Sequence, residues 1–207
     1  PTFIRWKPTG LFNAMISPIL NYNIKGVIWY QGESNAGKYE EYLDLFKSLV
    51  IDWRKKWIIG NFPFLYVQLP NFGEKQNEPK DEYWAFFRET QLKSLSIPNT
   101  GMAITIDLGE WNDIHPLNKK DVGKRLALVA QKVAYNNKNI VHSGPIYKSM
   151  SIKRNKAIIT FSNIGSGLVV KGNELKGFSI TGKNSKFVWA KAKIENNKVI
   201  VWSDEVK

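Results

Sequence analysis

Short apolar segments alternate with amphipathic segments through the first part of this chain. The continuous apolar runs have the length of buried strands and cover residues 27–31, 64–70 and 101–107. Apolar residues recur at helical spacing in the segments that follow them, at 38–57, 83–95 and 119–135. Buried strands that alternate with helices are typical of a parallel sheet covered on both faces. We therefore expect a three-layer α/β domain over residues 1–139.

The pattern changes near residue 140. Beyond it, Gly, Asn and Ser interrupt short alternating runs such as "KAIITFS", "GFSIT" and "KVIVWS", which are typical of antiparallel strands. We expect residues 140–207 to form a β-rich accessory domain, a small β-sandwich, after the linker "NNKNIVHSGP". Three parallel strands alone leave an apolar sheet edge unpaired, so the α/β domain is expected to be partial. The accessory domain is expected to be truncated as well, because the chain stops directly after "VIVWSDEVK".

Composition excludes some sites and bounds the partners. The chain has no cysteine, which excludes disulfides, thiolate metal sites and a cysteine nucleophile. The net charge is +12, but the positive charges are scattered lysines rather than dense basic runs. We therefore expect no nucleic-acid partner. Nucleic-acid binding is an alternative function that would rest on the net charge alone. Because no apolar run reaches 18 residues, we also expect no membrane partner.

The stretch "VIWYQGESNAG" at residues 27–37 places a serine just after a buried strand. Residues 32–36 depart from the nucleophile motif Gly-x-Ser-x-Gly only at the last position. One interpretation is therefore that Ser34 is the nucleophile of a hydrolase. The alternative is that Ser34 or Asn35 is the N-cap of the helix that follows.

The chain has two histidines, His115 and His142. His115 follows the third predicted strand, and side chains at the carboxyl ends of parallel strands gather where ligands bind. Asp113 lies two residues earlier, where a carboxylate can orient an imidazole. The alternative is a turn aspartate beside an exposed histidine. His142, in the predicted linker, is interpreted as a surface residue.

Gln31, Gly32 and Glu33 end the first predicted strand, at the sheet edge where His115 is expected. Polar side chains there are costly unless they are hydrogen-bonded, so they either brace the turn or belong to a site. A glycosidase with Glu33 and Asp113 as paired carboxylates is a further alternative, although the sequence does not give their separation. No strong metal-ligand spacing is present, and we expect no metal and no cofactor.

Two segments, "GVIWYQGESNA" and "NDIHPLNKKDVGKRLA", together resemble the sialate O-acetylesterase family of the SGNH (GDSL-like) hydrolase superfamily. The resemblance extends to "TGLFNAMISPIL", "SGPIYKSM", "LKGFSITG" and "FVWAKAKIENNKVIVWS". It implies a partial flavodoxin-like SGNH domain followed by a partial β-sandwich. It also implies a secreted or periplasmic serine esterase without cofactor, whose substrate is an acetylated sugar such as O-acetyl sialic acid.

The resemblance assigns roles to individual residues. His115 would be the general base, and Asp113 would orient it. The superfamily usually has Asp-x-x-His at this place, whereas this sequence has Asp-x-His. Gln31 and Gly32 would bind the oxyanion, while Glu33 would brace the turn. The family's nucleophile lies in an upstream Gly-Gln-Ser-Asn motif that this chain lacks. We therefore expect an inactive fragment whose serine comes from a missing N-terminal segment or a complementing chain, with Ser34 a helix cap.

A non-enzymatic sugar-binding module is the alternative function. Trp189, Lys191 and Lys193 alternate in one predicted strand and would form its binding platform.

Overall fold

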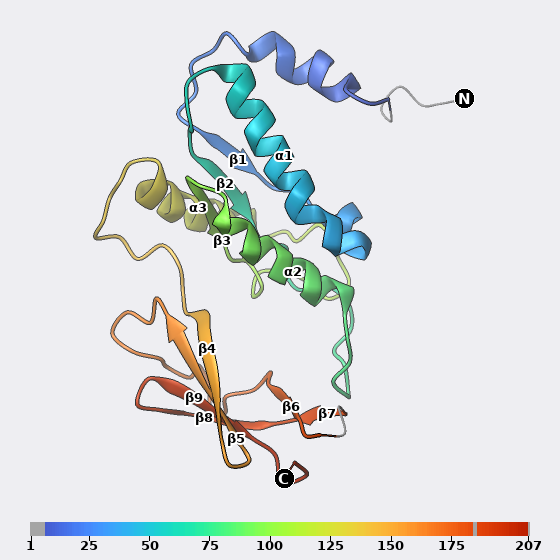
Figure 1. Cartoon of the computed structure of the whole chain (residues 1–207), viewed down its shortest axis with the longest axis vertical. Coiled ribbons are helices and arrows are strands. Elements are labelled where there is room, and N and C mark those ends of the chain that lie inside the picture. The colour runs from blue at the N-terminus through green and yellow to red at the C-terminus, as the bar shows by residue number, and fades with distance from the viewer. Residues whose placement is uncertain (1–6, 184–185, 207) are drawn as a thin grey trace.

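The computed structural model describes residues 7–183 and 186–206. Figure 1 shows an α/β part that ends with α3 and a β-rich part that begins with β4, joined by the segment 134–145. Before the first strand the chain forms a π-helix, Phe12–Ile16, and a 3-10 helix, Ser17–Ile19.

Three parallel strands form the sheet of the α/β part, in the order β1 (Val27–Trp29), β2 (Phe64–Val67) and β3 (Thr100–Ala103). Phe64 in the central strand lies opposite Val27 on one side and Thr100 on the other. The prediction of a parallel sheet is confirmed. The strands end two to four residues earlier than predicted, because pairing stops while the apolar sequence continues.

Helices cover both faces of this sheet, as the alternation predicts. Two of them, α1 (Tyr39–Trp57) and α2 (Tyr83–Lys93), lie on one face, and α3 (Lys119–Val133) lies on the other. Two short 3-10 helices precede α1 and follow α2, at Glu33–Lys38 and Ser94–Ser96. The three-layer arrangement brings the segment after every strand to one edge of the sheet.

The central strand β2 is buried on both faces, and its side chains alternate between two cores. Phe64 and Tyr66 belong to the core under α1 and α2, where Phe46 of α1 lies with its ring centroid 4.9 Å from that of Tyr66. Leu65 and Val67 belong to the core under α3. Each such buried side chain contributes about 1.5–3 kcal/mol relative to an exposed one, so β2 anchors both layers.

Gln91 attaches α2 to the end of β2. Its buried side chain donates to Val67 O at 3.1 Å and accepts from Leu69 N at 2.8 Å. These two bonds satisfy backbone groups of the last paired residue of the strand and of the residue two positions beyond it. The chain therefore leaves the sheet at a defined point before the loop 71–82 begins.

The β-rich part contains two antiparallel sheets (Figure 1). The larger sheet has the order β4 (Ile146–Lys153), β5 (Lys156–Ser162), β9 (Lys198–Trp202) and β8 (Lys191–Glu195). The smaller pairs β6 (Ser179–Thr181) with β7 (Phe187–Trp189). The prediction of antiparallel strands in this part is confirmed. That residues 140–207 form a separate β-sandwich domain stays a prediction.

The loop 71–82 connects the two parts, because Trp189 Nε1 in β7 donates to Asn77 O at 2.7 Å. This loop corresponds to the long polar segment between β2 and α2 (Figure 1). Across residues 7–183 and 186–206, every helix is too short or too polar to cross a bilayer.

Candidate active site

The loops after the three parallel strands meet at the carboxyl edge of the sheet. Gly109, after β3, donates its N–H to Asn71 Oδ1 after β2 at 2.9 Å. In return, Gly73 donates to Trp111 O at 2.9 Å. The ammonium group of Lys119 lies 4.9 Å from the centroid of the Tyr30 ring, next to the end of β1. The edge therefore gathers the segments that carry the predicted site residues.

Gly32 forms a sharp turn directly after β1. Its φ of +154° favours glycine, and a Cβ there would lie 2.6 Å from two ring atoms of the buried Phe87. Its N–H donates to Glu33 Oε2 at 2.9 Å. Glu33 thus braces the turn, and the Gly32 N–H is already occupied in this structure.

Gln31 is held by a residue to which the sequence analysis assigned only a capping role. Its Nε2 donates to Asn35 Oδ1 at 2.6 Å, and its carbonyl accepts from the hydroxyl of Tyr42 at 3.4 Å. Burial raises the pKa of Tyr42 to about 12, so this hydroxyl stays a donor at neutral pH. No local sequence pattern indicates this pair, because Gln31 precedes the 3-10 helix Glu33–Lys38 and the pairing depends on the turn at Gly32.

Ser34 does not cap α1. The chain makes a 3-10 helix over Glu33–Lys38, and Lys38 is the N-cap of α1, without a capping side-chain bond. The interpretation of Ser34 as a cap was wrong because this extra turn separates it from the helix. The Ser34 side chain is exposed and forms no hydrogen bond with any residue in 7–183 or 186–206, His115 included.

His115 lies on the loop between β3 and α3 with its side chain 86 % exposed. Its backbone N donates to Asp113 Oδ1 at 2.7 Å, whereas its Nδ1 is 3.9 Å from the same oxygen. Ile114 between them packs against the core under α1 and α2. On the other side of His115, Leu117 N donates to Glu110 Oε1 at 3.2 Å, so the loop is anchored on both sides of the exposed imidazole.

An ion pair holds this loop to α3. Arg125 donates to both carboxylate oxygens of Asp107, at 2.5 and 2.7 Å, and to Ile104 O at 2.7 Å. The Arg125 guanidinium holds the pKa of the Asp107 carboxyl below its usual value. The ion pair therefore fixes the start of the loop that carries His115, independently of Asp113.

The remaining candidate residues do not form one site. His142 is partly buried in the linker, and this burial, together with Lys132, lowers the pKa of its imidazole, so it is not simply a surface residue. Trp189 ends β7, whereas Lys191 and Lys193 lie in β8 of the other sheet, so the predicted single strand was wrong. The two lysines pair with acidic partners, Asp204 at 2.5 Å and Glu195 at 2.7 Å. Within the described ranges, no three His, Asp or Glu side chains converge in a possible metal site.

The family model for carbohydrate esterases of the sialic acid-specific acetylesterase type matches residues 2–132. The chain belongs to this family. The matched region contains the parallel sheet and both segments that hold Gln31 and His115. The family membership favours the esterase interpretation over the sugar-binding module.

Relatives of this acetylesterase family come from mammals and a bacterium. The sialate O-acetylesterase of Mus musculus is 34 % identical over 168 residues, which are 73 % of this chain and 31 % of the mouse protein. The Homo sapiens enzyme is 33 % identical over 174 residues, 75 % of this chain and 33 % of that protein. The crystal structure of a carbohydrate acetylesterase from Xanthomonas citri matches with a TM-score of 0.88 and 44 % identity.

The bacterial match covers 96 % of this chain and 46 % of the Xanthomonas chain. This chain therefore spans about a third of the length of the curated mammalian acetylesterases and just under half of the solved structure. The mixed α/β fold with a parallel sheet agrees with that of a known acetylesterase.

Proposed function

We propose that this chain forms part of a carbohydrate O-acetylesterase that acts on acetylated sugars, O-acetyl sialic acid among them, by a serine-hydrolase mechanism. The observation that carries the proposal is the exposed imidazole of His115, on an anchored loop at the carboxyl edge of the sheet, beside Asp113. The family match and the names of the relatives support the acetyl ester as substrate.

In the proposed mechanism, His115 takes the proton from a serine hydroxyl as the serine attacks the acetyl carbonyl. It then gives this proton to the sugar oxygen, which leaves as a hydroxyl while the acetyl group stays on the serine. His115 next takes a proton from a water molecule that attacks this acyl-enzyme, and acetate and the free serine result. Asp113 positions His115 through the backbone bond, and its second role is to stabilise the imidazolium that forms. The 3.9 Å separation fits an unbound enzyme, in which such contacts are looser.

The oxyanion of the tetrahedral intermediate needs donors, and Gln31 has one to offer. Its side-chain amide carries two N–H groups, of which one is used by Asn35. The other is the donor that we assign to the oxyanion. Gly32 can contribute its N–H only if Glu33 releases it. Loss of one such donor lowers the rate roughly 10²–10³-fold.

The nucleophile, in this proposal, lies outside these 207 residues, in a preceding segment or a second chain. The sequence contains no Gly-Gln-Ser-Asn motif. β1 pairs only with β2 among the described strands, and Ile28 is 66 % exposed beside the unpaired edge. A further strand would pair with the free edge of β1, and the helix that accompanies it would cover Ile28. In this proposal the 207 residues alone are inactive. The proposal also includes a secreted or periplasmic location for the enzyme, and a β-sandwich domain formed by the β-rich part.

The first test replaces His115 in the protein that contains both this chain and the upstream coding sequence. His115→Ala should lower kcat for acetate release by about 10²–10⁴-fold, because it removes the general base. The fold should remain stable, since the side chain is exposed. His142→Ala is the matched control and should keep its activity, because His142 lies in the linker.

Equal activity of the two variants would refute the role of His115. The 207-residue chain is assayed separately on 4-nitrophenyl acetate. Turnover by this chain that disappears in Ser34→Ala would instead identify Ser34 as the nucleophile.

A further inference from the structure

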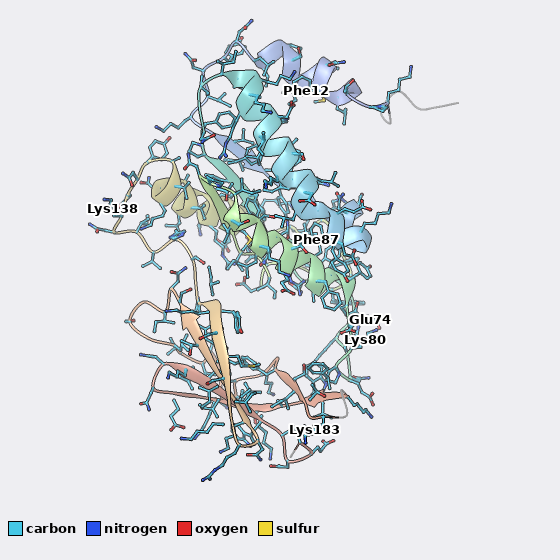
Figure 2. All side chains as sticks on the ribbon, in the orientation of Figure 1. Phe12, Glu74, Lys80, Phe87, Lys138 and Lys183 are labelled. Carbon is cyan, nitrogen blue, oxygen red and sulfur yellow. The ribbon has the colours of Figure 1, made fainter. Side chains whose placement is uncertain are left out.

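A cavity of about 460 Å³ lies between the loop 71–82, the first turns of α2 and the β6–β7 sheet. Gly177, Ser179 and Trp189 line it from the β-rich part. Figure 2 labels Glu74 and Lys80, two of its lining residues, on the loop between α2 and the β-rich part. Pockets that bind small ligands have volumes of about 300–1,000 Å³, so the cavity has room for a sugar ring.

Arg88 of α2 lines the cavity and has no ionic partner. Its side chain is partly buried, and burial lowers the pKa of the guanidinium. Among residues 7–183 and 186–206, neither a carboxylate nor another acceptor binds this side chain. A partly buried cation without an ionic partner gains from an anion that binds it, and the planar guanidinium matches the two oxygens of a carboxylate. Arg88 is therefore arranged to receive an anion.

Three acidic residues share the cavity but leave Arg88 uncompensated. Glu82 pairs with Lys80 at 3.1 Å. Glu74 and Glu78 lie on the exposed part of the loop, where water and salt screen their charges. Arg88 is less exposed than Glu74 and Glu78, so solvent screens its charge less for a ligand that reaches α2.

Aromatic rings form the walls around this charge. Tyr83 and Trp189 are half exposed, at 51 % and 49 %. The bond to Asn77 fixes the Trp189 indole, and the buried Trp84, which also lines the cavity, donates to Pro70 O at 2.7 Å. Flat aromatic faces of this kind pack against the C–H faces of sugar rings, and Tyr and Trp keep a polar group for hydrogen bonding.

We propose that this cavity is a subsite for a sugar that carries a carboxylate, with Arg88 as the carboxylate's partner and Tyr83 and Trp189 as the walls. That the ligand is a glycan rests on the proposed function. The subsite adjoins the active site, because Gly73 in its wall donates to Trp111, four residues before His115. It therefore contributes to the choice of substrate without contacting the reacting ester.

The test measures binding of sugars without acetyl groups to the 207-residue chain by calorimetry. The probes are sialyllactose and trigalacturonate, each compared with a neutral counterpart, lactose and galactotriose. An acidic probe should bind at least about tenfold more tightly than its neutral counterpart, the gain expected from one charged hydrogen bond. Arg88→Met should abolish this difference, and Trp189→Ala should weaken binding of acidic and neutral sugars alike.

Lys93→Met is the matched control, because it removes a positive charge from the same helix at an exposed position paired with Glu89. It should leave the affinities unchanged. Arg88→Lys, which keeps the charge but not the planar fork, should retain part of the preference and guards against misfolding of Arg88→Met.

Preference for sialyllactose alone, for trigalacturonate alone or for both supports the proposal and identifies the source of the carboxylate. Equal affinity for acidic and neutral sugars, unchanged binding by Arg88→Met, or no binding of any probe overturns it. Since no probe carries an ester, these results do not depend on whether the protein is an esterase.

Discussion

Gly32 occupies a position that a larger residue can take only by displacing the core. Gly32→Ala should destabilise the fold by about 1–3 kcal/mol, because the new Cβ meets Phe87 (labelled in Figure 2) and φ is +154°. Urea denaturation measures this change. Gly37→Ala is the control, because a Cβ there meets nothing within 4 Å. Equal losses of stability in the two variants would show that the contact with Phe87 is unimportant.

Asp113 has two separable roles, as an acceptor for the backbone and as a charge near the imidazole. Asparagine keeps the oxygen that accepts from His115 N, whereas alanine removes it. Asp113→Ala should therefore lower kcat by up to about 10²-fold through displacement of the loop, and Asp113→Asn should recover part of that loss. The assay is acetate release by the protein that contains the upstream segment.

If Asp113→Asn is as damaging as Asp113→Ala, the charge rather than the backbone bond is essential.

Residue types and their place after predicted strands were enough to select Gln31, Gly32, Glu33, Asp113 and His115 as candidates. The hydrogen bonds that these residues form could not be predicted from the sequence. The pairing of Gln31 with Asn35 depends on the turn at Gly32, and that turn depends on Phe87, which is 55 positions away. Ser34 was misplaced for the same reason, because local capping preferences do not report a 3-10 turn imposed by tertiary packing.

The ion pair between Asp107 and Arg125 joins two elements, the segment after β3 and the helix α3. Because the folded-state pKa of Asp107 is lowered, its stabilisation is present above the unfolded pKa near 3.8 and is lost as the pH falls below it. Both side chains are partly exposed, so the contribution is about 1 kcal/mol or less.

Asp107→Asn should therefore lower the free energy of unfolding at pH 6 and have little effect at pH 3. Chemical denaturation at the two pH values, at low salt, measures the difference. Asp52→Asn is the control, because Asp52 is exposed on α1 and forms no ion pair with any residue in 7–183 or 186–206. A loss that is the same at both pH values would contradict the assignment to Asp107 ionisation.

Elements with strong periodicity were predicted well. The helix expected at 38–57 is α1, Tyr39–Trp57, and the one expected at 119–135 is α3, Lys119–Val133. Strand ends were overestimated, because apolar character outlasts pairing in segments such as 64–70. Periodicity reports burial, and only the partner strand decides where hydrogen bonding ends.

The arrangement of the two parts was outside the reach of the sequence. The bond from Trp189 to Asn77 joins residues 112 positions apart, and no local pattern indicates it. The sequence of the loop 71–82 is polar and does not show what it packs against. In the structure it lies against the β-rich part and forms one wall of the cavity (Figure 1).

The attachment of this loop has a consequence for its motion. A neutral hydrogen bond such as that from Trp189 to Asn77 contributes only about 0.5–1.5 kcal/mol net. Breaking it costs far less than unfolding either part, which takes about 5–15 kcal/mol for a typical domain. Detachment of the loop from the β-rich part therefore requires far less free energy than unfolding, so the loop is the segment at the cavity that can move while both parts stay folded.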